Sequence, residues 1–254
     1  LLDETEPFMS RLETLPEEHP WLLQRKLTVK PDQLFGKRKQ YGLVLLNTNY
    51  SEVKKWIILH QNKETTVGKA ADTLTHFLVE PFIPHDEEYY LAFTSERDGD
   101  HIYFSAEGGI DIEQRWHSIK NMFIPTLGSI EGGLLEEEIP ADIPEEKRKI
   151  IIQFITALFH LYRDFDFAYL ELNPFTIDQT GAVHLLDAVA EIDNCASWKN
   201  EQSWNNLMFP TPFGRKESPE EEYLSQIDER SGASLKLTIL NPDSRIWNIL
   251  SGGG

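Results

Sequence analysis

The chain has 254 residues, of which 40% are hydrophobic and 26% are charged, enough to bury a substantial core and to form more than one compact unit. Lys and Arg total 24 against 42 Asp and Glu, which gives a formal net charge of -18. Because binding to phosphate backbones needs a broad basic face, nucleic acid and anionic membranes are poor partners for this soluble, globular type of chain.

The cysteine content indicates the redox compartment, and the apolar runs indicate whether the chain could cross a membrane. The single cysteine, Cys195, cannot form an internal disulfide, so a reducing compartment such as the cytoplasm is predicted. The longest apolar run, KIIIQFITALFHLYRDF, is interrupted by Gln153, His160 and Arg163 and falls short of the ~20 apolar residues of a membrane span. It is predicted to be a core helix. The chain opens on LLDETEP without an initiator methionine, and we expect it to be a piece of a longer protein.

The first predicted elements are two strands around a basic loop. Residues 1–20 are acidic and contain prolines, which suggests a connector or a docked helix. RKLTVKP and YGLVLLN then read as strands, separated by the polar loop DQLFGKRKQ.

A short helix and a further strand follow. SEVKKWIILHQ has the apolar spacing of a helix, and TTVGKAADTL contains a turn. HFLVEPFIP is an apolar strand that Pro81 and Pro84 bring to an end.

The middle of the chain predicts a hairpin, a long helix and a second strand pair. EEYYLAFTSERDGDHIYFSAEGGIDIE has two β-rich runs around Asp98-Gly99, a dipeptide that tolerates the positive φ angles of tight turns. Pro144 opens a helix over about residues 147–163, and FAYLELNPFTID and AVHLLDAVA form the next strand pair. Helices alternating with mostly antiparallel strand pairs favour an α+β class, a mixed α/β architecture of several lobes. A composition shift near Arg215 predicts a domain boundary there.

Polar residues interrupt the second strand pair. Side chains alternate faces along a strand, so Glu171 and Asn173 lie on the same side, and an antiparallel return brings Asp187 near that face. Carboxylate and amide oxygens are ligands that suit Mg²⁺, which takes the rest of its octahedron from water and phosphates. The alternative is the solvated polar face of an ordinary hairpin.

Cations and an apolar strand end complete a candidate nucleotide site. Lys30 ends a strand, and the loop over 37–39 (Lys-Arg-Lys) is the densest positive cluster in the chain. HFLVEPFIPHDEEYY ends at two prolines and leads to Glu87 and Glu88, which leaves backbone groups for an adenine edge and a carboxylate for ribose hydroxyls. Alone, the first is also typical of a solvated turn and the second of a strand end with surface acids.

Other chemistry has no support in the sequence. The eight histidines show no zinc-ligand spacing. There is no GxSxG elbow, no Walker-type phosphate loop and no GxGxxG fingerprint.

Several blocks, in order, resemble the ATP-grasp portion of the ATP-citrate lyase family, from about Glu18 to Gly254. The blocks are LTVKPDQLFGKR, YGLVLLN, FLVEPFIPH, AEGGIDIE, YLELNP, LLD, PTPFGR and SGASLKLTILNPDSRIW. The wider relatives are the β subunits of succinyl-CoA synthetases. The resemblance implies an ATP-grasp fold of two lobes followed by the start of a truncated succinyl-CoA synthetase β-like domain, with the boundaries 1–83, 84–214 and 215–254.

The resemblance also implies roles for individual residues. ATP would be bound by Lys30, Arg38, Lys39, Pro81, Ile83, Glu88, Asp187, Gly232, Ala233 and Ser234. Mg²⁺ would be held by Asn173, Asp187, Asp228, Ser231 and Ala233, with Glu171 as an orienting carboxylate. Lys39 departs from the pattern, because it stands where the family has glycine and adds bulk and charge there. The EEYY segment is shorter than in animal enzymes, so Glu87 and Glu88 could exchange roles.

The implied reaction converts citrate, CoA and ATP into acetyl-CoA, oxaloacetate, ADP and phosphate. The γ-phosphoryl group passes first to a histidine, which belongs to a CoA-ligase α-like portion absent from this chain. A citrate-synthase-like portion would supply cleavage, so we expect part of a hetero-oligomeric or tetrameric enzyme.

Three alternatives stay open. The chain could be the large subunit of a citryl-CoA or succinyl-CoA synthetase, which ligates without cleavage. It could also be a nucleotide-binding regulatory subunit without turnover, or, more remotely, an acidic interaction domain without a ligand.

Overall fold

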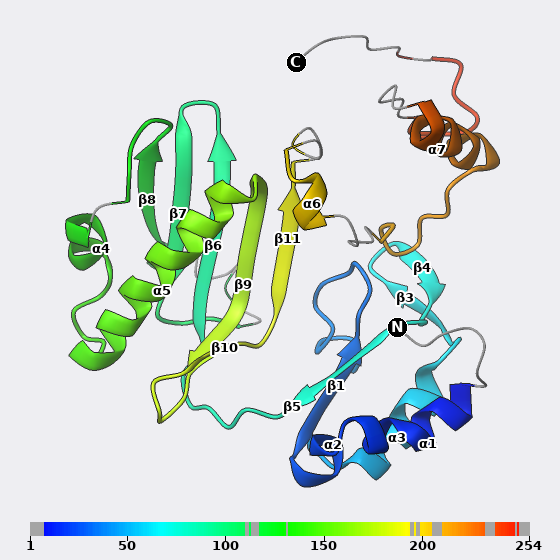
Figure 1. Cartoon of the computed structure of the whole chain (residues 1–254), viewed down its shortest axis with the longest axis horizontal. Coiled ribbons are helices and arrows are strands. Elements are labelled where there is room, and N and C mark those ends of the chain that lie inside the picture. The colour runs from blue at the N-terminus through cyan, green and yellow to red at the C-terminus, as the bar shows by residue number, and fades with distance from the viewer. Residues whose placement is uncertain are drawn as a thin grey trace. The chain divides into compact units, whose positions relative to one another are not determined.

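The structure is a computed structural model that describes residues 8–109, 112, 117–130, 132–193, 196, 199–204, 210–231, 237–246 and 248. The helices are α1 (Phe8–Glu18), α2 (Trp21–Gln24), α3 (Tyr50–His60), α4 (Gly132–Glu138), α5 (Glu145–Asp164), α6 (Glu201–Trp204) and α7 (Pro219–Ser231). The strands are β1 (Leu27–Pro31), β2 (Leu45–Thr48), β3 (Glu64–Val67), β4 (Ala70–Thr73), β5 (Phe77–Pro81), β6 (Tyr89–Glu96), β7 (Gly99–Ser105), β8 (Lys120–Pro125), β9 (Phe167–Ile177), β10 (Val183–Leu185) and β11 (Ala188–Ile192). Helices and antiparallel strand pairs in several sheets confirm the predicted α+β class (Figure 1).

The chain divides into two compact units, each of which gathers segments that are distant in the sequence. Unit 1 consists of Leu1–Thr28, Leu46–Tyr50 and Glu80–Met208, and unit 2 of Val29–Leu45, Ser51–Val79 and Phe209–Gly254. The predicted domain boundaries are not tested by this division and stay a prediction.

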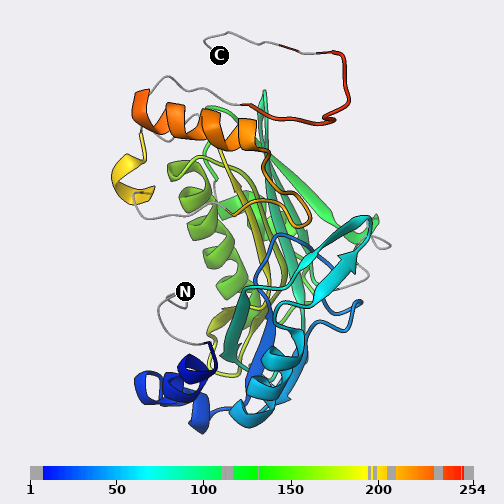
Figure 2. The same cartoon turned by 90° about the vertical axis from the view of Figure 1, so that its right-hand side faces the viewer.

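A large antiparallel sheet forms the centre of unit 1. Its strands follow the order β10-β9-β6-β7-β8, and β11 also pairs with β9. The helix α5 lies along one face of this sheet (Figures 1 and 2). Within the described residues, no helix combines the length and the apolar character that crossing a membrane requires.

The core of unit 1 follows from two sequence periods. The helix α5 buries Ile151, Ile155, Phe159 and Tyr162, spaced so that they share one helix face. The strands alternate, and each buries every second side chain against α4 and α5. The buried strand residues of this core are Tyr89, Leu91, Phe93, Ile102, Phe104, Met122, Ile124, Leu170, Leu172, Phe175 and Ile177. The KIIIQFITALFHLYRDF run is thus a core helix, as predicted.

The predicted β6–β7 hairpin is confirmed, but the expected reason for its glycine is wrong. Glu96 pairs with Gly99, and neither Asp98 nor Gly99, both in the described part of the chain, has a positive φ. A Cβ on Gly99 would instead lie 2.2 Å from Ile124 O on β8. Glycine is required here because a neighbouring strand approaches closely, a contact between distant residues that local turn chemistry does not report.

Two further strand predictions need correction. YGLVLLN was expected to be one strand, but β2 begins at Leu45, because Gly42 and Leu43 donate backbone hydrogen bonds to Lys39 O (3.1 Å) and Arg38 O (2.9 Å) within the preceding loop. TTVGKAADTL was assigned only a turn, whereas it forms most of the β3–β4 hairpin, with Gly68 at φ 61° in the turn.

The predicted strand AVHLLDAVA is broken into β10 and β11. Leu186 and Asp187 lie at the break, and their backbone N–H groups both donate to Pro174 O (3.0 and 3.2 Å). Pro174 on β9 has no N–H to return, so a regular antiparallel ladder cannot continue past it.

The start of the chain's described part is a docked helix. In α1, Leu12 is buried, and the Tyr50 hydroxyl donates to Leu12 O (2.6 Å). For residues 8–18, this observation favours the docked helix over the connector, the two possibilities that the sequence left open.

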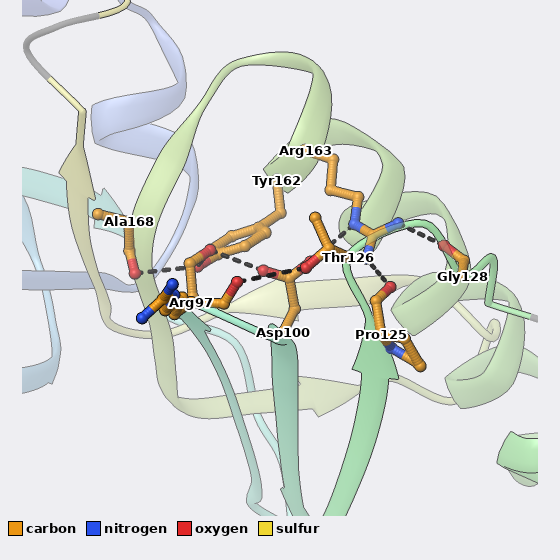
Figure 3. Close-up of polar contacts among 9 residues, drawn as sticks. Arg97, Asp100, Pro125, Thr126, Gly128, Tyr162, Arg163 and Ala168 are labelled. Atoms are coloured by element: carbon orange, nitrogen blue, oxygen red, sulfur yellow. Dashed lines mark hydrogen bonds and ion pairs between the residues drawn. The ribbon is translucent and has the colours of Figure 1, made fainter. Parts of the chain in front are cut away.

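The last turn of α5 is tied to the sheet by the side chain of Arg163 (Figure 3). Its guanidinium donates to Asp100 Oδ2 (2.7 Å), Gly128 O (2.6 Å) and Pro125 O (3.2 Å) and lies over the Phe159 ring. Asp100 is buried, so leaving its carboxylate without this partner would be destabilising. The contacts join α5, the β6–β7 hairpin and the loop after β8.

The Tyr162 hydroxyl continues the same network. It donates to Ala168 O (2.9 Å) and lies 2.8 Å from Ser95 Oγ, which donates to Asp100 Oδ1 (2.7 Å). Burial raises the pKa of Tyr162 to about 12, so the hydroxyl keeps its hydrogen in the core.

We expect Arg163→Met to lower the free energy of unfolding by about 1.5–3 kcal/mol, the typical contribution of hydrogen bonds to a charged group. Methionine retains the stem over Phe159 but leaves Asp100 buried without its cation. Urea denaturation measures the effect. Lys149→Ala is the control, since Lys149 pairs with Glu145 on an exposed helix face and should leave the midpoint unchanged. Equal midpoints for Arg163→Met and wild type would contradict this role.

In unit 2, α7 begins with a reciprocal cap. Glu221 N–H donates to Ser218 Oγ (3.1 Å), and Ser218 N–H donates to Glu221 Oε2 (2.8 Å). Glu221 Oε1 also accepts from Arg215 (2.6 Å) and from Ile239 N–H (2.8 Å). The carboxylate therefore ties the later segment around Ile239 to the start of the helix.

Glu221 should make unit 2 sensitive to acid. Backbone hydrogen bonds, from Ser218 first and then Ile239, lower its pKa from 4.5 to about 2. A lowered folded-state pKa contributes stability that is present above the unfolded value and is lost as pH falls from 4.5 towards about 2.

We expect Glu221→Gln to remove this part of the pH dependence and to speed exchange of the Ile239 amide hydrogen. Thermal melting between about pH 6 and about pH 2, a range that includes the lowered pKa of Glu221, and hydrogen exchange measure the two effects. Glu220→Gln, at the exposed neighbouring position, is the control. An unchanged pH profile in Glu221→Gln would refute the assignment.

Candidate functional site

The strand β9 separates an apolar face from a polar one. Leu170 and Leu172 point into the core, while Glu171 and Asn173 are half-buried on the opposite face of the sheet. This confirms the predicted alternation. It explains why a strand inside the sheet carries polar residues, since its second face does not pack on α5.

Asp187 lies beside Asn173, as the antiparallel return predicted. Asn173 N–H donates to Asp187 O (3.2 Å), and the register sets Ala188 opposite Leu172. Asp187 is half-buried at the break between β10 and β11. The break frees this residue from the regular ladder and brings two hard-oxygen side chains to neighbouring backbone positions.

The loop after β7, Glu107–Gly109, joins Asn173 to Glu88. Gly109 N–H donates to Asn173 Oδ1 (2.8 Å), and Gly108 N–H donates to Glu88 O (2.6 Å). A Cβ on Gly109 would lie 2.5 Å from Glu88 Oε2, and one on Gly108 would lie 2.7 Å from Tyr89 O. Gly109 also has a φ of 96°, which favours glycine. Both glycines are therefore required for this close approach.

The Tyr169 hydroxyl orients the Glu171 carboxylate. Tyr169 donates to Glu171 Oε2 (2.5 Å). Burial first, then the hydrogen bond to Glu171, raises the pKa of Tyr169. Burial first, then the charge of Glu171, likewise raises the pKa of Tyr90. Both hydroxyls therefore keep their hydrogens, and the orienting role expected for Glu171 stays a prediction.

Two adjacent acids after β5 have different surroundings. Glu87 pairs with Lys147 and accepts from the Tyr89 hydroxyl (2.8 Å), and the Lys147 hydrogen bond followed by that of Tyr89 lowers the pKa of Glu87. Glu88 lies instead next to Gly109. Glu87 is thus paired with Lys147 on α5, which leaves Glu88 as the better candidate for the acid of the site.

The backbone before these acids carries Pro81 and Ile83. Pro81 ends β5, and Ile83 follows it in a segment anchored where Phe82 N–H donates to Lys26 O (2.7 Å). These two residues, with Glu88, Asn173 and Asp187, all belong to unit 1.

The candidate cations belong to unit 2. Lys30 lies in β1, the central strand of the sheet ordered β2-β1-β5, and is 8% exposed. Arg38 donates to Gln33 O (3.2 Å) in the loop after β1. Lys39, expected to replace a family glycine, has an exposed side chain and no positive φ, unlike Lys37 (59°). The loop therefore accommodates Lys39 without turning its side chain inward.

The PTPFGR block holds this basic loop. The rings of Phe213 and Phe35 are 4.6 Å apart, and the Arg38 guanidinium lies 5.5 Å from the Phe35 ring. Gly214 N–H donates to Asp72 Oδ2 (3.1 Å) on β4. Residues after 209 thereby help to shape a loop at residues 33–38.

The predicted ATP and Mg²⁺ residues between 228 and 234 lie partly outside the described residues. Ser231 is the exposed last residue of α7 and Asp228 lies on the same helix, whereas the side chain of Asp228 and all of Gly232, Ala233 and Ser234 lie outside the described residues. Among described side chains, no group of three or more His, Cys, Asp or Glu is arranged to hold a metal. Asn173 and Asp187 still fit Mg²⁺ by their donor chemistry, since this ion takes few protein oxygens.

Comparison with known families identifies the fold. A family model described as the ATP-citrate synthase ATP-grasp domain matches residues 5–204, and one described as the ATP citrate lyase citrate-binding domain matches residues 215–254. The chain belongs to the ATP-citrate synthase family. The ATP-grasp fold expected from the sequence is confirmed.

Individual members of the ATP-citrate synthase family give the same result. The chain is 43% identical to the Arabidopsis thaliana ATP-citrate synthase alpha chain protein 1 over 243 residues, 96% of this chain and 57% of that protein. It is 40% identical to human ATP-citrate synthase over 94% of this chain and 22% of that protein. The structure of ATP citrate lyase from Methanothrix soehngenii in complex with citrate and coenzyme A matches with a TM-score of 0.81 at 42% identity, covering 98% and 57% of the two chains. The chain thus spans little more than half of these relatives at most.

Sequence reasoning missed several residues of the site. His85, Tyr169 and Phe213 were given no role. His85 contacts Ile83 O, Tyr169 donates to Glu171, and Phe213 packs on Phe35 in the basic loop. The available signal was their position inside the EPFIPH, YLELNP and PTPFGR blocks. Gly109 lies inside the AEGGIDIE block, but the sequence assigned it no role.

Proposed function

We propose that this chain is the ATP-binding and phosphoryl-transferring part of an ATP-citrate lyase. The observation that carries the proposal is the Glu107–Gly109 loop, which hydrogen-bonds both the backbone of Glu88 and the side chain of Asn173. It links the carboxylate suited to a ribose with the oxygens suited to a metal and phosphates. Membership in the ATP-citrate synthase family supports the same assignment.

Each group of residues would bind one part of the nucleotide. The backbone at Pro81 and Ile83 would meet adenine, and Glu88 would accept hydrogen bonds from the ribose. Lys30 and Arg38 would neutralise phosphate charge, because positioning and charge neutralisation account for most of the catalysis of phosphoryl transfer. Lys39, with Asp228, Ser231 and the segment over 232–234, would contribute near the triphosphate.

Asn173 and Asp187 would hold Mg²⁺, and the ion when bound would neutralise charge on the phosphates. Gly109 N–H orients Asn173 Oδ1, and an amide oxygen has a second lone pair left for a ligand. Glu171, oriented by Tyr169, would provide a fixed carboxylate on the same face.

The reaction assigned to the complete enzyme consumes citrate, CoA and ATP and yields acetyl-CoA, oxaloacetate, ADP and phosphate. This chain would donate the γ-phosphoryl group to a histidine of a CoA-ligase α-like portion, and a citrate-synthase-like portion would cleave the product. Those portions make the enzyme a hetero-oligomer or part of a tetramer, which we place in the cytoplasm because the chain has a single cysteine.

We expect Asp187→Asn to abolish most phosphoryl transfer while leaving the melting temperature close to that of wild type. The amide is nearly the same size as the carboxylate but lacks the charge that offsets Mg²⁺ beside a triphosphate. The measurement is transfer of labelled γ-phosphate to the histidine-containing portion across a Mg²⁺ titration. Glu191→Gln, an exposed carboxylate on β11, is the control and should keep its rate. A normal rate at low Mg²⁺ in Asp187→Asn would exclude the metal role.

We expect Lys30→Met to weaken Mg-ATP binding by about 1.5–3 kcal/mol, the usual value for a lost charge-assisted hydrogen bond. Methionine preserves the buried stem of Lys30 in β1. Calorimetry measures the affinity, and Lys55→Met serves as the control because Lys55 is exposed on α3 beside Glu52. If ATP binds Lys30→Met as tightly as wild type, Lys30 does not belong to the site.

A further inference from the structure

The segment between β5 and β6 is fixed at both ends. Phe82 N–H donates to Lys26 O (2.7 Å), and the Thr176 hydroxyl donates to Glu87 O (2.7 Å). His85 lies between these anchors and is half-buried. The anchors limit the movement of the backbone, so the His85 ring makes its contacts within a segment whose two ends are held.

Both nitrogens of the His85 ring face oxygen atoms. Nδ1 lies 2.7 Å from Ile83 O, and Nε2 lies 3.2 Å from Glu88 Oε1. A carbonyl and a carboxylate are acceptors, so each contact is a hydrogen bond when the ring nitrogen carries a hydrogen. A neutral ring carries one hydrogen and makes one of these two hydrogen bonds, whereas the protonated ring makes both. In either form the side chain lies between the backbone group assigned to adenine and the carboxylate assigned to ribose.

The two carboxylate oxygens of Glu88 have different surroundings. Oε1 is directed at His85, while Oε2 lies on the side of Gly109, where a Cβ would come within 2.5 Å. The neighbouring acid, Glu87, is held by Lys147 and Tyr89 and does not compete for the ring. A carboxylate held through one oxygen presents the other in a defined direction, which reduces the entropy lost on binding.

We propose that His85 is a positioning residue for nucleoside recognition, which aims Glu88 at the ribose hydroxyls by holding Oε1. The proposal rests on the function proposed above and adds a residue to which neither the sequence nor the family comparison assigned a role. His85 itself would not touch the phosphates or the metal. Its effect should therefore depend on whether the nucleotide has ribose hydroxyls.

The experiment compares binding of Mg-ATP and Mg-2′,3′-dideoxy-ATP by calorimetry. Three variants separate the two contacts of the ring. His85→Gln places an amide N–H near the position of Nε2 and retains a donor to Glu88, His85→Asn places one near Nδ1 and retains a donor to Ile83 O, and His85→Ala removes both. Thermal melting confirms that each variant is folded.

Wild type should bind ATP more tightly than dideoxy-ATP. His85→Ala and His85→Asn should bind ATP about tenfold more weakly, as for one lost hydrogen bond to a charged group, with little change for dideoxy-ATP. His85→Gln should recover most of the preference. Glu88→Gln should lose the preference as well, and adding His85→Ala to it should change little further, because both residues act on the same contact.

Equal weakening for both nucleotides in His85→Asn and His85→Gln would overturn the proposal and show that His85 only stabilises the segment. An unchanged preference in His85→Asn would overturn it too. Failure of wild type to bind either nucleotide would instead contradict the proposed ATP-binding function. If His85→Ala does not fold, the Gln and Asn variants still decide, since each retains one of the two contacts.

Discussion

The two faces of the strand β9 separate the core of unit 1 from the polar residues of the candidate site. Leu170 and Leu172 must pack against α5, and because side chains alternate along a strand, Glu171 and Asn173 are directed to the other face. Pro174 then interrupts the ladder and allows Asp187 to lie beside Asn173 at a break between β10 and β11. The hydrophobic core thus positions polar residues that it does not contain. The Arg163 network, which ties α5 to the β6–β7 hairpin, holds the sheet and helix in the arrangement that makes this possible.

Close backbone approach is the second requirement of the site. The Glu107–Gly109 loop bonds Glu88 and Asn173 through backbone N–H groups, and side chains at its two glycines would collide with Tyr89 and Glu88. Backbone donors lose little entropy on binding because they are already fixed by the fold. In such a site the main chain aligns the residues, and side chains are left to contact the ligand. This arrangement is consistent with the proposed phosphoryl transfer, a reaction that depends mainly on positioning.

In unit 2 the basic loop after β1 depends on residues far away in the sequence. Phe213 packs on Phe35, Leu34 bridges to Pro212, and Gly214 bonds Asp72. The match to the ATP-grasp family model ends at residue 204, before this segment, and the citrate-binding match begins at residue 215, after it. Residues 210–214 therefore contribute to the shape of the loop that carries Arg38 while lying between the two matched regions.

The sequence alone determined the α+β class, the long core helix, the β6–β7 hairpin, the alternation along β9 and the family, because periodicity and ordered motif blocks are local properties. It also indicated that Asn173 and Asp187 would be neighbours, since an antiparallel return sets that register. Only the tertiary structure decided that Gly99 is required by the approach of β8, that Glu87 is bound by Lys147 while Glu88 lies beside Gly109, and that His85 bridges Ile83 and Glu88. These facts depend on contacts between residues distant in the chain or on side-chain directions in an irregular segment, and neither leaves a periodic signal in the sequence.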